Sequence, residues 1–143
     1  LEKIEKGSIS SAEALHASLT GDESEYIVCF FRYLIAAWMQ QEADTFGIFI
    51  EATTGIPLEA QSVADYCTRE VIAVGKECEE PHIVALAQAL QVAFTIEYLD
   101  NSVGSACTTH TYGPLDGDVA LPLAPGALAL LYRPGHYDIL YKM

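Results

Sequence analysis

The chain has 143 residues, of which 7 are Lys or Arg and 20 are Asp or Glu, so its formal net charge is −13. This length predicts one domain, and an apolar content of 51% is enough for a hydrophobic core. The acidic balance excludes nucleic acid as an expected partner, because phosphate groups bind Lys and Arg side chains. It suits a basic partner instead. No apolar run reaches the roughly 20 residues of a membrane-spanning helix, so no membrane partner is expected.

Residues 1–7 resemble the last turns of a helix. Leu1 and Ile4 share a face, and Gly7 suits the position after a helix end. No N-cap residue precedes them. A helix with an end and no start indicates a chain that begins inside a larger domain, and the alternative is an ordinary frayed terminus.

Helix-start signals follow. Ser10 with Glu13 forms a capping box for a short helix that Gly21 ends, and Asp22 with Glu25 resembles a second one. Apolar residues at helical spacing then predict the main core helix. Its predicted inward stripe comprises Ile27, Phe30, Phe31, Leu34, Ile35 and Trp38.

Three further helices are predicted. The first spans residues 43–50 and precedes a loop at residues 53–57. The second is capped by Ser62 and extends toward Val71. The third begins at residues 79–81, where acidic side chains and a first-turn proline favour a helix start. Its apolar stripe comprises Ile83, Leu86, Ala87 and Leu90.

The hydrophobic period becomes alternating near residue 92, which predicts a strand over residues 92–99. Residues 100–126 are rich in Gly, Pro, Thr and Asp and predict a connector longer than a usual loop, either mobile or functional. Residues 127–132 and 136–141 predict a hairpin around a tight turn at Arg133-Pro134-Gly135. Four or five helices followed by three strands define an α+β fold.

His136 and Asp138 form the candidate catalytic pair. Side chains alternate faces along a strand, so these two point the same way. A carboxylate beside an imidazole fixes its tautomer and stabilises the imidazolium, which makes a general-base unit. The alternative is a pair of exposed polar residues on a strand, because short motifs have a high false-positive rate.

Four cysteines are the candidate nucleophiles. Cys29 and Cys67 lie in helix patterns, where Cys29 is expected to be a buried thiol and Cys67 a structural one. Cys78 lies near a helix start, a position that can lower the pKa of a thiol, but it is not the expected nucleophile. Cys107 lies in the long connector and is expected to be an ordinary loop thiol. Their spacing contains no C-x-x-C motif, and no signal peptide is visible, so an intracellular, reduced protein is expected.

No metal or cofactor site is predicted. His16 and His82 lie in predicted helices and His110 in the connector, so the histidines lack the spacing of a metal site. Neither a Gly-x-Ser-x-Gly elbow nor a Gly-rich phosphate-binding motif occurs.

Residues 130–141, Leu-Leu-Tyr-Arg-Pro-Gly-His-Tyr-Asp-Ile-Leu-Tyr, resemble the closing segment of the otubains, the cysteine deubiquitinases of the ovarian-tumour (OTU) class. Upstream stretches resemble otubain elements as well. These are residues 26–38, residues 62–67 with Glu70, Val71 and Cys78, residues 82–90, and residues 97–100.

This resemblance implies a single papain-like OTU domain over residues 1–143, in which a helical part precedes a small, mostly antiparallel sheet that ends in a hairpin. It implies a Cys-His-Asp isopeptidase that cleaves ubiquitin from lysine side chains and from polyubiquitin. His136 would be the general base and Asp138 its orienting partner. Ubiquitin and ubiquitin-conjugating enzymes are the implied partners, and cytoplasm and nucleus the implied compartments.

Otubains carry their nucleophile in an Asp-Gly-x-Cys segment, which residues 1–143 lack. Three hypotheses follow. The chain is the C-terminal portion of an isopeptidase whose nucleophile precedes it. It is a complete but inactive relative that binds ubiquitin or ubiquitin-conjugating enzymes. It is an enzyme that uses Cys78 or Cys107 in a new arrangement.

Overall fold

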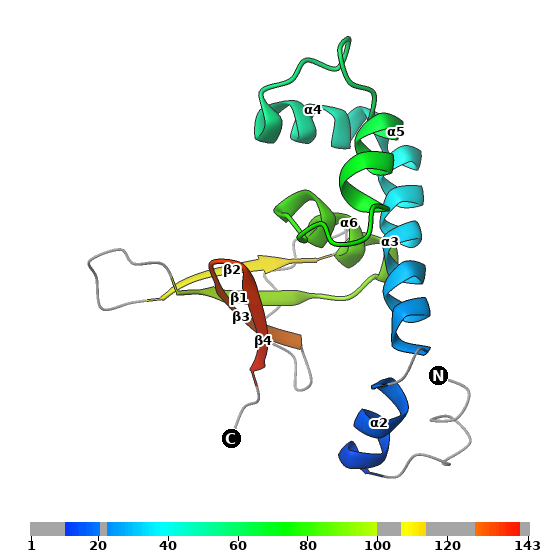
Figure 1. Ribbon diagram of the computed structural model, residues 1–143. Coiled ribbons are helices and arrows are strands. Elements are labelled where there is room, and N and C mark those ends of the chain that lie inside the picture. Colours follow the sequence, from blue (N-terminus) through cyan, green and yellow to red (C-terminus); the bar gives the residue numbers. More distant parts are fainter. Residues whose placement is uncertain (1–10, 21–22, 100–106, 114–127, 141–143) are drawn as a thin grey trace.

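The computed structural model describes residues 11–20, 23–99, 107–113 and 128–140 (Figure 1). Helices precede a sheet along the chain, so the predicted α+β class is confirmed. No helix of the described ranges is long and apolar enough to cross a bilayer. The elements are α2 (Ala12–Leu19), α3 (Glu23–Gln41), α4 (Ala43–Thr54), α5 (Val63–Tyr66), the π-helical turn η1 (Cys67–Val71), α6 (Glu80–Leu90), β1 (Phe94–Tyr98), β2 (Thr108–Tyr112), β3 (Leu128–Arg133) and β4 (His136–Leu140).

The C-terminal half of α3 lies in the hydrophobic core. The Trp38 indole N–H donates to Gln88 Oε1 of α6 at 3.0 Å, and Cys67 Sγ of η1 lies 3.8 Å from the Ala36 carbonyl oxygen. This half of α3 therefore contacts both α6 and η1. Its buried residues are Ile35, Ala36 and Met39.

The N-terminal half of α3 does not follow the prediction. Ile27 and Phe30 were predicted to point inward, but they are 40% and 62% exposed. Figure 1 shows the reason, because these turns extend past α6 toward α2 and no described element covers them. Helical periodicity identifies an apolar face, but it does not show how far along the helix another element covers that face. Leu90, predicted inward on α6, is likewise 39% exposed.

Local capping signals place several helix ends correctly. The Asp65 N–H donates to Ser62 Oγ at 3.1 Å, and the Ser62 N–H donates to Asp65 Oδ2 at 3.3 Å, which is a complete capping box. Gly55 ends α4 with a φ of 69°, so Thr53 and Thr54 belong to the helix and not to the predicted loop.

Other predicted helix ends are not all testable. Ser11 caps α2 by accepting a hydrogen bond from the Ala14 N–H at 3.1 Å. The N-cap of α2 is thus Ser11, one residue later than the predicted Ser10. Ser10 itself, the predicted stops Gly7 and Gly21, and the second predicted cap Asp22 lie outside the described residues.

The sheet has the order β2-β1-β3-β4, with β1 parallel to β3 and the other two pairs antiparallel. The mostly antiparallel hairpin-ended sheet is confirmed, but β2 lies inside the predicted connector, and His110 lies on this strand. The residues of β2 are β-branched or aromatic, as is typical of strands, but four of the five are exposed. The strand therefore has no buried apolar face that periodicity could reveal. Its pairing with β1 makes it a strand, and periodicity did not reveal that pairing.

The register gives the sheet two different faces. Tyr98, Tyr132 and Tyr137 share one face, because Tyr98 pairs with Tyr132 and Tyr132 with Tyr137. This face looks toward the helices, since the Tyr137 hydroxyl donates to the Cys78 carbonyl oxygen at 3.4 Å. His136 and its neighbours of the same parity lie on the opposite, outer face.

Arg32 of α3 holds the chain that follows η1. Its guanidinium donates to the carbonyl oxygens of Val71 at 2.7 Å, Ala73 at 3.1 Å and Lys76 at 2.6 Å. Carbonyl groups at a helix end lack intrahelical donors, and hydrogen bonds from a charged donor are about twice as strong as neutral ones. Arg32 therefore fixes the segment that leads to residues 77–80.

We predict that Arg32→Ala lowers the free energy of unfolding by about 2–4 kcal/mol, because it leaves part-buried carbonyls without a donor. Arg32→Lys is expected to lose less, since it keeps the charge. Urea denaturation measures both, with the surface variant Lys76→Gln as the control, expected within about 0.5 kcal/mol of wild type. An Arg32→Ala protein as stable as the control would contradict this role.

Candidate active site

The turn before β4 places the candidate catalytic pair. Gly135 has a φ of 78°, which suits the third position of a type II turn, with Pro134 at the second. The predicted tight turn is thus confirmed. It pairs Arg133 with His136 and Leu131 with Asp138 across the hairpin.

The structure brings His136 and Asp138 together. His136 Nε2 lies 3.1 Å from Asp138 Oδ1, and their side chains are 57% and 44% exposed. A carboxylate oxygen accepts, so in the neutral imidazole Nε2 is the donor, and Nδ1 has no hydrogen-bond partner among the described residues. The predicted shared face is therefore present, and the imidazole is accessible.

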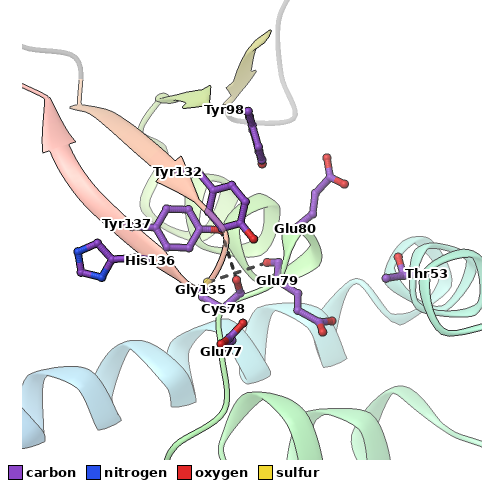
Figure 2. A pocket seen from close by; sticks show the side chains of 10 residues that line it. All are labelled: Thr53, Glu77, Cys78, Glu79, Glu80, Tyr98, Tyr132, Gly135, His136 and Tyr137. Carbon is purple, nitrogen blue, oxygen red and sulfur yellow. Dashed lines mark hydrogen bonds between the residues drawn. The ribbon is translucent and has the colours of Figure 1, made fainter. Parts of the chain in front are cut away.

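A cavity of about 560 Å³ lies between the hairpin and the segment before α6. Figure 2 shows the Tyr132 and Tyr137 rings side by side, with centroids 4.8 Å apart, while the His136 ring points away from them. His136 thus borders the cavity from the outer face of the sheet. The lining is acidic and aromatic: Glu77, Glu79, Glu80, Tyr98, Tyr132 and Tyr137, with Thr53, Cys78, Gly135 and His136.

Cys78 lines this cavity, but it lacks the lowered pKa expected of a reactive thiol. Desolvation of the sulfur raises the pKa of its thiol to about 11, although the residue as a whole is exposed. The positive charge of Arg32 opposes this shift and the negative charge of Glu79 adds to it. The helix start does not lower the pKa of Cys78, because removal of the sulfur from water outweighs the nearby cation.

The other cysteines have structural surroundings. Cys67 is fully buried, and burial raises the pKa of its thiol to about 11, which confirms the predicted structural thiol. Cys29 on α3 is half-buried rather than buried. Cys107 directly precedes β2, and its Sγ lies 2.8 Å from the Tyr98 carbonyl oxygen. Within the described ranges, no group of three or more His, Cys, Asp or Glu residues is arranged to hold a metal ion.

A closed set of hydrogen bonds among Tyr66, Glu79 and His82, of which Glu79 lines the cavity, was missed by sequence reasoning. The Glu79 N–H donates to His82 Nδ1 at 3.1 Å, so His82 Nε2–H donates to the Tyr66 oxygen at 3.0 Å. The Tyr66 hydroxyl then donates to Glu79 Oε2 at 3.3 Å. Both rings are buried, with His82 3% exposed. The only sequence signal was a histidine three residues after an acidic N-cap.

The surroundings of His82 make the stability pH-dependent. Desolvation, with a smaller contribution from Arg32, lowers the pKa of His82 to about 4, against about 6.5 in an unfolded chain. The unfolded state therefore binds the proton first, and stability falls as the pH drops from about 6.5 toward 4. The loss attributable to His82 is about 3 kcal/mol, and it is absent above pH 6.5.

We predict that His82→Asn, whose side-chain oxygen can still accept from the Glu79 N–H, flattens this dependence while lowering stability at pH 7. Urea denaturation at several pH values between 4 and 7 measures the slope. The carboxyl groups shared by both proteins cancel in the difference between them. Equal slopes for the two proteins would show that His82 does not titrate as proposed.

Comparison with known proteins identifies the family. The model of the Peptidase C65 Otubain family matches residues 1–142. Human ubiquitin thioesterase OTUB1 is 36% identical over 142 residues, which are 99% of this chain and 46% of that protein. The ovarian tumor domain-containing deubiquitinating enzyme 1 of Arabidopsis thaliana is 38% identical over 144 residues, 94% and 44% of the two chains.

Comparison with a solved structure supports the same family assignment. In a complex of ceOTUB1 with ubiquitin aldehyde and UBC13~Ub, the matched chain has a TM-score of 0.80 and 31% identity, over 99% of this chain and 53% of that one. The chain spans about half the length of the curated relatives it matches. The resemblance found at residues 130–141 is thus confirmed over nearly the whole chain. The chain belongs to the Peptidase C65 otubain family.

Proposed function

We propose that this chain supplies the general base and its orienting carboxylate to a cysteine-type ubiquitin isopeptidase. The observation that carries the proposal is the 3.1 Å contact between His136 Nε2 and Asp138 Oδ1 on an exposed sheet face. Family membership supports the substrate class, because the matched relatives are named ubiquitin thioesterases and a deubiquitinating enzyme.

The two imidazole nitrogens of His136 have different roles in this proposal. Because Nε2–H donates to Asp138, the lone pair on Nδ1 of His136 accepts the proton of the attacking thiol. The thiolate attacks the isopeptide carbonyl, and the imidazolium protonates the departing lysine amine. Water, deprotonated by the same imidazole, then hydrolyses the thioester and releases the thiol. Asp138 holds the tautomer and stabilises the imidazolium throughout.

We place the nucleophile outside residues 1–143, in an Asp-Gly-x-Cys segment of the same protein. The raised pKa values of Cys67 and Cys78, both about 11, keep these thiols protonated near pH 7. Isolated residues 1–143, which lack an Asp-Gly-x-Cys segment, are expected to hydrolyse no ubiquitin substrate.

In the complete protein, we predict that His136→Ala lowers kcat toward a ubiquitin-lysine isopeptide by about 10²–10⁴-fold, because the general base is lost. Asp138→Asn is expected to cost a comparable or smaller factor, since the equivalent loss in a serine triad is about 10⁴. Steady-state kinetics measures both. Glu97→Gln is the control, because Glu97 lies on the same sheet face and its recorded partner is Thr109, not His136. Full activity in Asp138→Asn would remove Asp138 from the triad.

A second prediction concerns the nucleophile. A ubiquitin molecule with a C-terminal electrophile should label the complete protein once, on a cysteine outside residues 1–143, and peptide mass mapping locates the adduct. Labelling on Cys78 or Cys107 would refute this placement and favour a new arrangement of the site. Alanine at the mapped cysteine should abolish labelling.

Binding without catalysis is the second candidate. It is favoured by solved relatives that are OTUB1 complexes with ubiquitin aldehyde and UBC13~Ub or UBCH5B~Ub. We therefore propose ubiquitin, polyubiquitin and ubiquitin-conjugating enzymes as partners. A purely binding role requires that the complete protein bind a conjugating enzyme charged with ubiquitin while hydrolysing no isopeptide, with His136→Ala changing neither property.

A further inference from the structure

The Asp138 carboxylate is held at both of its oxygens. Oδ1 accepts from His136 Nε2 at 3.1 Å, and Oδ2 accepts from Arg133 Nη2 at 3.1 Å. Arg133 pairs with His136 across the hairpin, so the three side chains lie together on the outer face. We propose that Arg133 is a positioning residue, which holds the Asp138 carboxylate in the orientation that its contact with His136 requires. This inference rests on the proposed function of the pair.

The exposure of Asp138 makes such support necessary. Its side chain is 44% exposed, and rotation about the bond to a carboxylate group is only weakly restricted. Among the described residues, Arg133 and His136 are the side chains that donate hydrogen bonds to its oxygens. Without Arg133, water replaces the guanidinium at Oδ2 and the carboxylate can turn away from the imidazole.

The pair Arg133–Asp138 is poorly suited to stabilising the fold. The Arg133 side chain is 58% exposed, and ion pairs at this exposure contribute little to the free energy of folding. Replacement of Arg133 should therefore change the chemistry more than the stability. Lysine keeps the charge but lacks the planar guanidinium, so it should substitute in part.

The test uses the complete protein and a ubiquitin isopeptide substrate. Arg133→Gln is expected to lower kcat by about 3- to 10-fold with KM changed less than about 2-fold, and Arg133→Lys to recover part of the loss. In an Asp138→Asn background, Arg133→Gln should have no further effect, because its partner carboxylate is gone. Lys76→Gln removes a comparable surface ion pair with Glu70 and should leave kcat unchanged.

Several outcomes would overturn the inference. A rise in KM at constant kcat would make Arg133 a substrate contact, and a full Arg133→Gln effect in the Asp138→Asn background would separate it from Asp138. Wild-type kcat in Arg133→Gln, combined with inactive His136→Ala, would reject the role of Arg133 and leave the proposed function intact.

The role of Arg133 can also be tested without measuring activity. This test remains valid if the His136→Ala variant shows that the proposed function is wrong. Long-range ¹⁵N–¹H spectra of the His136 ring should show the Nε2–H tautomer in wild type and in Arg133→Lys. Arg133→Gln should shift the ring toward a mixture of both tautomers. An unchanged tautomer in Arg133→Gln would reject the positioning role on its own.

Discussion

The arrangement of the site depends on the register of the β3–β4 hairpin. The Pro134-Gly135 turn, with the left-handed φ of Gly135, pairs Arg133 with His136 and Tyr132 with Tyr137. Because side chains alternate along a strand, a slip of one residue would exchange the two faces. The observed register directs the tyrosines toward the helices and leaves the imidazole on the outer face. The same turn therefore determines which side chains pack and which remain available for chemistry.

Polar contacts connect this hairpin to the helical part. The Tyr137 hydroxyl contacts the Cys78 carbonyl at the edge of the cavity shown in Figure 2. The segment that contains Cys78 is held from one side by Arg32, which caps the chain after η1. From the other side it is held by the ring of Tyr66, His82 and Glu79. Side chains remote from the imidazole therefore contribute to its position relative to the helices, through a network of connected hydrogen bonds.

Local sequence signals were sufficient to predict part of the candidate site. Strand alternation predicted the shared face of His136 and Asp138, and the Pro-Gly pair predicted the turn that precedes His136, because both depend on neighbouring residues alone. β2 was missed because its threonines become a strand only through pairing with β1. The exposure of Phe30 depends on which elements reach α3, and the raised pKa of Cys78 depends on desolvation within the folded chain. Such properties arise from tertiary packing.

The contact of Arg133 with Asp138 could not be predicted from the sequence either. The two residues are five positions apart on different strands, and only the hairpin register brings them together. A sequence pattern identifies the carboxylate as a partner of the imidazole, but it does not reveal the group that restrains the second oxygen. The outer face is thus better described as three interacting side chains than as a pair.

The central claim is that His136 activates a thiol, and the pH dependence of thiol alkylation tests it most directly. In the complete protein, iodoacetamide should alkylate the nucleophile rapidly already near pH 6–7. A neighbouring imidazolium stabilises the thiolate and so lowers the pKa of the thiol by about one unit or more. His136→Ala should move the alkylation midpoint up toward about 8.5, the value of an ordinary thiol. An alkylation profile that His136→Ala leaves unchanged would contradict the claim.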